Sequence, residues 1–365
     1  KVCSDASDVW SCRRVLPQVR QYNRVCKAWR SFQLLLSGMS EVNKKSDRKP
    51  EIWPAPMEGV MTQPLIRAAS KLGLVDRWMT PFWRVTSSPV KKSKLKQWFA
   101  PFVDSGLPVT AQLMGEDAEM ITRVAEELLR FGASDINLNF GCPSGQVVRH
   151  GCGGGMLKRI KDLILLFARV KKSLAGVPVG IKIRSGFDEI NLAWLQELSL
   201  DDSDKIFFHY RLVKEAYLPF PFKTALRRFA EVRNVIPNSW LIANGDIDTL
   251  SKMTDVLKLG FDGIMTGRGW LRNPSLLMQM TGICPAQTDE HFWRKELFLN
   301  TLIEAEKDDF STFSRGNAIE VAILIWGAGN PVFQRLIKND GKVTDDATLL
   351  RSMINEFDEL LLARK

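Results

Sequence analysis

A cysteine follows a predicted strand within the segment Ser134–Gly155. Apolar and polar residues alternate from Asp135 to Phe140, which is the period-two pattern of a strand with two chemically different faces. Pro143 ends that strand because its fixed φ suits a turn, so Cys142 is presented at the strand's end. A lone cysteine is more often a buried structural residue. A thiol beside a polar strand end and the glycines of Gly151–Gly155, however, indicates an active site.

Two other polar residues lie in or at the ends of further predicted strands. Lys182 stands in a run of Val, Ile and Gly, where a lysine is costly unless an anionic or polar group meets it. The alternative is a lysine whose ammonium extends to the surface. His209 ends another strand and is one of only three histidines, although a lone histidine more often has a structural role. Their shared position at strand ends strengthens both signals.

Glycine and charged residues follow the last two predicted strands. Asn244-Gly245-Asp246 comes after one strand and Gly267-Arg268-Gly269 after the other. In a (β/α)8 barrel, the loops after strands seven and eight commonly hold a phosphate, which glycine backbone and an arginine can bind. This pattern predicts an anion site at those two strand ends.

The elements that must position these residues alternate between strand and helix from Glu51 onward. The predicted strands are 52–57, 77–81, 108–113, 135–140, 177–184, 205–209, 240–244 and 261–266. The predicted helices among them are 64–72, 118–131, 157–174, 192–200, 222–235 and 248–259, with a polar loop at Lys91–Phe99. Eight strands with their chemistry at the carboxyl ends predict a (β/α)8 TIM barrel.

The barrel is expected to cover residues 51–284. A doubly wound open sheet is the alternative, but it would be favoured by a GxGxxG segment after the first strand, and the sequence has none there. Helical patterns alone recur at 291–307, 318–326, 331–337 and 347–362. We therefore expect an all-α C-terminal helical domain at 285–365.

Charge and composition limit the partners and the compartment. The chain has 365 residues and a net charge of +10, which permits a polyanionic partner without proving one. Residues 285–365 hold ten basic and fourteen acidic residues, so a nucleic-acid surface is expected mainly on the barrel. Six cysteines with no CxxC pair favour a reducing compartment, hence a cytoplasmic protein without a structural zinc site. No apolar run is long enough to span a bilayer, so no membrane partner is expected.

The first fifty residues differ from the rest. No acidic residue occurs from Val9 to Ser40, while Arg13, Arg14 and other basic residues do. An acid-poor, arginine-containing segment is typical of a transit peptide, which would place the protein in an organelle. The segment can also be a basic arm or an extension with no role in folding, and we favour these over the transit peptide. We exclude residues 1–50 from the fold.

As an ordered set, the motifs resemble those of the tRNA-dihydrouridine synthases, which are flavin-binding barrels with a helical C-terminal domain. The matching segments are Ala55–Val60, Gln112-Leu113, Asn139–Ser144, Gly153–Gly155, Lys182–Arg184, His209 with Arg211, Asn244–Asp246 and Gly267–Gly269. The first and third segments are most similar to the bacterial C-type branch, which modifies position 16 of the tRNA D-loop. The resemblance covers roughly residues 52–280.

The resemblance implies a role for each matching residue. It implies that FMN binds to the backbone of Pro56, Met57 and Glu58, to Gln112, to Lys182 and near His209. It implies that the flavin phosphate binds at Asn244, Gly245, Asp246, Gly267 and Arg268. Cys142 corresponds to the proton donor to the substrate base, with hydride coming from FMN that NADPH or NADH has reduced. A thiol suits that role because its ordinary pKa of about 8.5 keeps it protonated near neutral pH.

The same resemblance implies a tRNA substrate. Asn139, Arg84 and Tyr217 match positions that contact the uridine or the RNA. Lys91–Phe99 could contact phosphate and stack a base, or could be an ordinary solvated loop. We expect a monomer without an obligate protein partner.

Two departures from the family pattern bear on these expectations. Tyr210 and Leu212 replace a glycine and a threonine, and the tyrosine is expected to crowd the phosphate side of the flavin. Residues 317–323 are apolar and acidic where relatives carry a basic helix. Two other functions therefore stay open: a flavin barrel acting on a free small molecule, and a non-catalytic RNA-binding relative.

Overall fold

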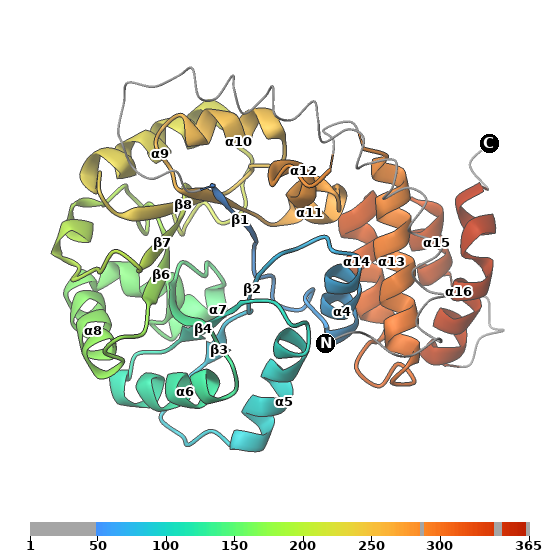
Figure 1. Ribbon diagram of the computed structural model, residues 1–365, viewed down its shortest axis with the longest axis horizontal. Helices are drawn as coiled ribbons and strands as arrows, with labels where there is room; N and C mark the ends of the chain where they lie inside the picture. The colour runs from blue at the N-terminus through green and yellow to red at the C-terminus, as the bar shows by residue number, and fades with distance from the viewer. Residues whose placement is uncertain (1–48, 285–287, 339–344, 363–365) are drawn as a thin grey trace, which may run out of the picture.

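Within residues 49–284, nine parallel strands form one sheet that curls into a nearly closed barrel (Figure 1). The computed structural model describes residues 49–284, 288–338 and 345–362, with side chains as far as Phe357. The strands are β1 (Glu51–Pro54), β2 (Trp78–Met79), β3 (Trp83–Arg84), β4 (Val109–Met114), β5 (Asp135–Phe140), β6 (Val179–Arg184), β7 (Lys205–His209), β8 (Trp240–Asn244) and β9 (Gly263–Thr266). Their order is β1-β9-β8-β7-β6-β5-β4-β2, with β3 also on β4. The predicted TIM barrel is confirmed.

The second barrel strand differs from its prediction. The single strand expected at 77–81 is two short strands, β2 and β3, which pair with successive parts of β4. Trp78 is opposite Val109, and Trp83 is opposite Leu113. The interruption between them holds Pro81, which has no backbone N–H to donate to a ladder.

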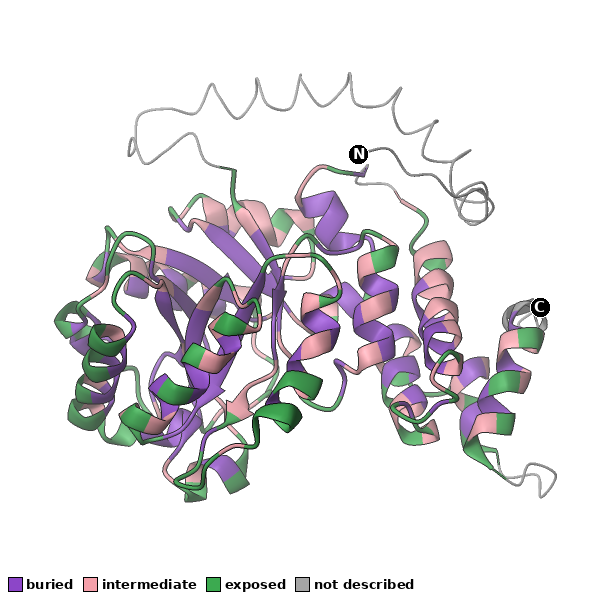
Figure 2. Ribbon diagram, turned by 60° about the horizontal axis from the view of Figure 1, so that its bottom comes forward, coloured by how far each residue is buried: buried purple, intermediate pink, exposed green. Residues whose placement is uncertain are grey.

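Side chains alternate between the inside of the barrel and the layer beneath the helices, because neighbouring strand residues point to opposite faces. The lower interior is an apolar cluster of Trp53, Met79, Phe207, Ile242 and Met265. The outward residues of the strands join the large core against the helices, and Figure 2 shows the strands almost wholly buried between these layers. The inside thus changes from apolar at its base to polar at the carboxyl ends of the strands.

Helices and short turns connect the strands on the outside. They are α4 (Gln63–Lys71), α5 (Lys92–Val103), α6 (Ala118–Arg130), α7 (Gly145–Arg149), η1 (Gly153–Lys158), α8 (Ile160–Ser173), η2 (Ala193–Glu197), α9 (Phe222–Val235), α10 (Leu250–Leu257), α11 (Arg268–Arg272) and α12 (Leu276–Met280). The predicted polar loop at Lys91–Phe99 is wrong, because this segment begins helix α5. The helix predicted from Leu157 begins at Ile160, after a 3-10 turn that contains the glycine run.

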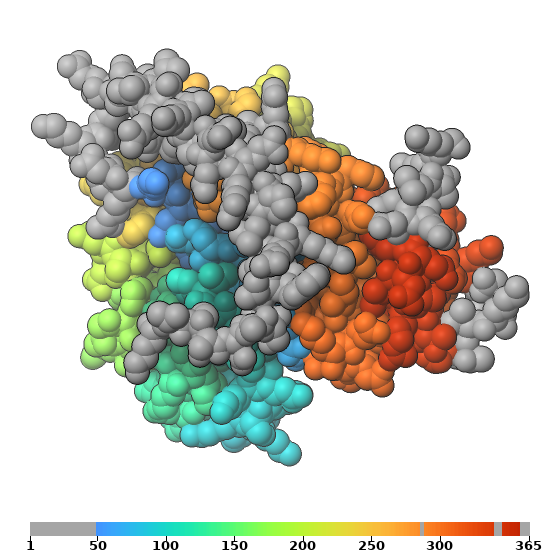
Figure 3. All heavy atoms as spheres, turned by 45° about the vertical axis from the view of Figure 1, so that its right-hand side comes forward, coloured from blue at the N-terminus to red at the C-terminus, as the bar shows by residue number. Residues whose placement is uncertain are grey.

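Four helices follow the barrel and lie together on one side of it (Figures 1 and 3). They are α13 (Glu290–Glu306), α14 (Arg315–Trp326), α15 (Pro331–Ile337) and α16 (Asp346–Leu362). All four agree with the predicted helices to within a few residues. The predicted domain boundary at 284 adjoins residues 285–287, which lie outside the described residues. Of the predicted extension at 1–50, residues 1–48 also lie outside them.

Helix α13 docks on α4 of the barrel. Arg67 of α4 pairs with Asp308 at 2.7 Å between Nη1 and Oδ2, and Lys71 pairs with Glu304 at 2.6 Å. Glu304 is buried and also accepts from Lys307 at 2.7 Å. These pairs join the acidic end of α13 to a basic face of α4. Among the described helices, none is long and apolar enough to cross a membrane.

Two leucine substitutions test how much the buried core of the helical layer contributes to the free energy of unfolding. Leu297 of α13 has 0% of its surface exposed, whereas Leu165 of α8 is 56% exposed. We expect Leu297→Ala to lower the free energy of unfolding by about 2–5 kcal/mol, because it leaves a cavity. Leu165→Ala should change it by less than about 0.5 kcal/mol. Urea denaturation of both variants measures the difference, and equal effects would contradict the described packing.

Candidate active site

The predicted site residues meet at the carboxyl ends of the strands. Gln112, Asn139, Lys182, His209 and Asn244 are on β4 to β8, and their side chains form a polar layer above the apolar base. The other predicted residues lie in the segments that follow a strand: Pro56, Met57 and Glu58 after β1, Cys142 after β5, Tyr217 after β7, Gly245 and Asp246 after β8, and Gly267 and Arg268 after β9. Arg84 is exposed at the end of β3. Parallel strands bring these residues to one mouth.

The turn that carries Cys142 is held by Asn139. The side-chain oxygen of Asn139 accepts from the backbone N–H of Gly141 and of Cys142, each at 3.0 Å. Its amide nitrogen donates to Oε1 of Gln112 at 2.8 Å. Asn139 therefore shapes the cysteine turn, and its predicted contact with a substrate base stays a prediction.

The glycine run packs directly against that turn. The N–H of Gly154 donates to the carbonyl of Cys142 at 3.0 Å. A Cβ on Gly154 would lie 2.8 Å from the same carbonyl oxygen, and one on Gly153 would lie 3.1 Å from Cβ of Cys142. These positions require glycine because the backbone approaches too closely for a side chain. Cys142 itself remains partly accessible, and burial raises the pKa of its thiol, so it stays protonated at neutral pH.

Lys182 brings a positive charge to the mouth without a counter-charge. Burial first, and then the charge of Arg184, lower the pKa of Lys182 to about 8. Among the described residues, no side chain forms an ion pair or hydrogen bond with its ammonium. Burial and the same neighbouring cations lower the pKa of His209 well below its ordinary value, so this imidazole is neutral. The mouth is therefore suited to an anionic or carbonyl-rich ligand.

Arg184 joins the cysteine turn to the segment after β7. Its guanidinium donates to the carbonyl of Gly141 at 2.8 Å, of Leu212 at 3.0 Å and of Ala216 at 2.8 Å. Burial lowers the pKa of Arg184 to about 10, so it keeps its charge and spreads it over these oxygens. From the sequence, Arg184 was recognised only as part of its motif and not for this role. Its position two residues after Lys182, on the same strand face, is the signal that could have identified it.

The β1 and β9 loops form the opposite wall of the mouth. The N–H of Ala55 donates to the carbonyl of Thr266 at 2.8 Å, which brings the Pro56–Glu58 segment beside Gly267. A Cβ on Gly267 would lie 3.5 Å from Cβ of Ala55 and 3.8 Å from Sδ of Met57. The predicted cofactor segments from the two ends of the barrel sequence are thus neighbours.

Asp246 is the carboxylate of the predicted phosphate end. It accepts from the guanidinium of Arg211 and from the hydroxyl of Tyr210, and Arg268 lies 3.7 Å away. Burial acts to raise the pKa of Asp246, but the hydrogen bonds from Tyr210 and Arg211 outweigh it and hold the pKa below its ordinary value. Tyr210 was expected to crowd the phosphate side. Its ring packs on Phe229 in the layer beneath the helices, with 5.9 Å between ring centroids, and the ring edge also lies against Gly245, so the expected crowding stays a prediction.

Gln112 is buried and engaged within the barrel. Its Nε2 donates to Oδ1 of Asn137 at 2.9 Å and lies 3.1 Å from Sδ of Met79. Nδ2 of Asn137 is buried without a hydrogen-bond partner among the described residues. This Gln112–Asn137–Asn139 network braces β4 against β5, and Asn137 was not predicted as a member of it from the sequence.

Arg84 and Tyr217 lie on the rim. Tyr217 is 62% exposed, and its ring lies near the guanidinium groups of Arg184 and Arg268, with 5.6 and 5.8 Å from Cζ to the ring centroid. Phe99 of α5 is fully buried, and Trp98 packs on Trp83 with 5.1 Å between centroids. Phe99 is therefore inside the core and not available to stack a base, whereas Trp98 is half-buried.

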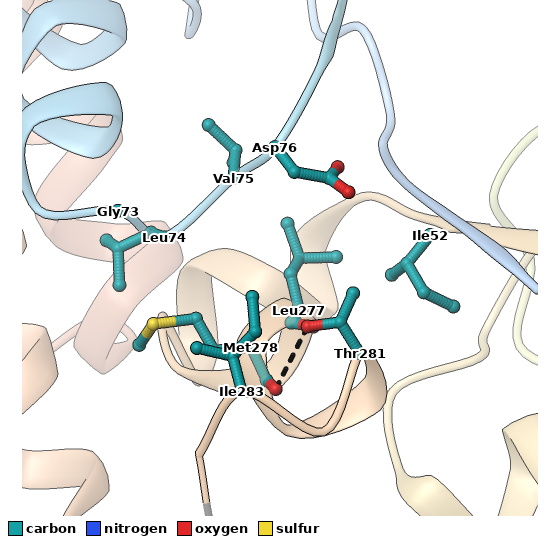
Figure 4. A pocket seen from close by; sticks show the side chains of 9 residues that line it. All are labelled: Ile52, Gly73, Leu74, Val75, Asp76, Leu277, Met278, Thr281 and Ile283. Atoms are coloured by element: carbon teal, nitrogen blue, oxygen red, sulfur yellow. Dashed lines mark hydrogen bonds between the residues drawn. The ribbon is translucent and has the colours of Figure 1, made fainter. Parts of the chain in front are cut away.

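A small pocket lies at the other end of the barrel and has no part in this site. Figure 4 shows its lining, which includes Ile52, Asp76 and Met278, and its volume is about 10 Å³. This is about the room that one water molecule needs. The chemistry-bearing residues lie at the carboxyl ends of the strands instead.

The fold and the site define a (β/α)8-barrel protein in which a thiol and a partly buried cation without a counter-charge share the mouth of the barrel. The family model described as dihydrouridine synthase matches residues 54–312, and the chain belongs to this family.

Curated relatives share part of this chain. It is 29% identical over 246 residues to the tRNA-dihydrouridine(16) synthase of Neisseria meningitidis serogroup B, covering 64% of this chain and 72% of that protein. It is 28% identical over 275 residues to the tRNA-dihydrouridine(16) synthase of Pseudomonas syringae pv. tomato, covering 69% and 84%. Among solved structures, a morphinone reductase mutant in complex with tetrahydroNAD has a TM-score of 0.44 at 11% identity, covering 63% of this chain and 85% of that one.

The uncompensated charge of Lys182 predicts a pH-dependent gain of stability on its removal. An unfolded lysine has a pKa of about 10.4, so the folded chain, with Lys182 at about 8, binds fewer protons between these values. The cost of charging Lys182 is therefore complete below pH 8 and vanishes above about pH 10.4. We expect Lys182→Met to stabilise the flavin-free protein at pH 7 by on the order of 1–3 kcal/mol. Urea denaturation at pH 7 to 10 measures this, and a destabilised variant at pH 7 would show that Lys182 has a partner.

Proposed function

We propose that this protein reduces a uridine of tRNA, at position 16 of the D-loop, to 5,6-dihydrouridine with FMN as cofactor and NADPH as reductant. Its family membership and the names of its relatives support the reaction and the position. The observation that carries the proposal is the accessible, protonated thiol of Cys142 at the mouth that also holds Lys182.

The residues present fit a flavin. The ammonium of Lys182 lacks a partner among the described residues, and a carbonyl-rich ring system would supply the acceptor that its burial demands. Lys182 would meet the ring, where positive charge stabilises the reduced anionic form. Gly245, Gly267 and Arg268 would hold the phosphate, as loops after the last two barrel strands commonly do.

When bound and reduced by NADPH, FMN supplies the hydride that is added at C6 of the uracil ring. Cys142 gives its proton to C5, which completes the 5,6-saturated base, and the thiolate regains a proton from solvent. The raised pKa of Cys142 keeps this proton in place until it is needed. Asn139 and Gly154 hold the turn, so the thiol does not have to be ordered during the reaction.

The tRNA would be bound mainly by the rim of the barrel. Arg84, Lys91 and the α5 residues Lys94 and Lys96 are exposed, and α5 begins at the mouth because barrel helices run antiparallel to the strands. Helix α14 contributes little positive charge, since Arg315 is its one basic residue.

Replacement of two cysteines separates the proposed proton donor from a packing residue. We expect Cys142→Ala to retain FMN but to lower dihydrouridine formation by about 10²- to 10⁴-fold, because the proton donor is lost. Cys152→Ala is the matched control, since Cys152 is buried beside the same turn with its Sγ directed at the carbonyl of His150. The assay uses purified protein, unmodified tRNA transcript and NADPH. Full activity of the Cys142 variant would overturn its assignment as the acid.

The position of the modified base is tested in cells. Deleting the gene should abolish dihydrouridine at position 16 of the tRNAs that carry it, and restoring the wild-type gene, but not the Cys142→Ala form, should return it. Sequencing of tRNA after chemical treatment that stops reverse transcription at dihydrouridine maps the sites. Loss at another position would correct the site, and an unchanged map, with activity only on a free pyrimidine or a small enone, would replace the proposal with small-molecule reduction.

A further inference from the structure

Tyr210 is fixed in place at the end of β7. It is fully buried, its ring packs edge-on against Phe229, and it is nearly parallel to the ring of His209 at 5.6 Å between centroids. Its backbone carbonyl accepts from Arg228 at 3.1 Å and from the hydroxyl of Ser185. These contacts fix the position of the Tyr210 ring, so the ring can support the backbone segment that packs against it.

The turn after β8 lies on the Tyr210 ring. A Cβ on Gly245 would be 2.7 Å from Cδ1 of Tyr210, so the backbone of Gly245 rests directly on the ring edge. The φ angle of Gly245 is +114° and that of Asp246 is +54°, and the latter is rare for a residue other than glycine. A non-glycine residue keeps such a conformation only where its surroundings enforce it.

The hydroxyl of Tyr210 supplies that enforcement. It donates to Oδ2 of Asp246 at 2.7 Å, and the guanidinium of Arg211 donates to the same oxygen. The side chain of Asp246 is 26% exposed at the mouth, where an unrestrained carboxylate would repel a bound phosphate. Because both donors bind Oδ2, they orient the Asp246 carboxylate toward Arg211 and Tyr210.

We propose that Tyr210 is a positioning residue for the phosphate end of the site: it sets the backbone of Gly245 and holds the Asp246 carboxylate against Arg211. The phosphate of FMN then meets a preset turn instead of a mobile carboxylate. This inference rests on the proposed function, in which FMN binds at this mouth. It also explains how a tyrosine can occupy a position that faces the phosphate turn without filling the cofactor's space.

The test compares FMN with riboflavin, which lacks the phosphate. Tyr210→Phe keeps the ring under Gly245 but removes the bond to Asp246. We expect it to weaken FMN binding about tenfold and riboflavin binding less than about twofold, because a hydrogen bond to a charged group contributes on that order. Quenching of flavin fluorescence by the full chain gives both dissociation constants, and circular dichroism checks the fold.

A double-mutant cycle tests whether Tyr210 affects FMN binding through Asp246. In an Asp246→Ala background, Tyr210→Phe should cost no further FMN affinity, because the acceptor of the Tyr210 hydroxyl is already lost. Unchanged FMN affinity of Tyr210→Phe, equal losses for FMN and riboflavin, or full additivity in the cycle would each overturn the inference. A wild-type chain that binds neither flavin would overturn the proposed function itself, together with this inference.

Discussion

Lys182, Arg184 and Arg211 bring three positive charges to the carboxyl ends of β6 and β7, where Arg184 and Arg211 are buried and Lys182 is partly buried. Charge in such a place must be met by dipoles, by an opposite charge or by a ligand. Arg184 is met by three backbone carbonyls and Arg211 by Asp246. Lys182 alone has no such partner among the described residues, so the mouth is incomplete without an anionic or carbonyl-bearing ligand.

The partners of these cations also determine the shape of the mouth. The three carbonyls that Arg184 binds come from the cysteine turn and from the segment after β7, so one side chain sets the distance between them. Asp246, bound by Arg211 and Tyr210, does the same for the turn after β8. The same contacts therefore compensate the buried charges and set the geometry of the site, so a substitution that removes such a contact affects both.

The helical layer brings negative charge close to the mouth of the barrel. Helix α14 buries Ala318, Val321 and Ala322 and exposes Glu320, whose carboxylate approaches Gly59 of the loop after β1. An acidic side chain beside the mouth repels phosphate, so the basic rim of the barrel must supply most of the attraction for a polyanion. The role of α14 is better described as packing against the barrel.

The sequence by itself determined the barrel and most of the mouth, because strand periodicity and turn residues are local signals, and parallel strands must end at one edge. Local signals failed at α5, where the lysines and aromatic residues predicted a loop. The segment is a helix instead, because Leu95 and Phe99 are buried on the side that packs against the barrel. They also failed for Tyr210, since only the tertiary structure shows its hydroxyl reaching Asp246, 36 residues away along the chain. That Lys182 has no hydrogen-bond or ion-pair partner among the described residues is likewise visible only in the tertiary structure, because the side chains around it come from strands distant in sequence.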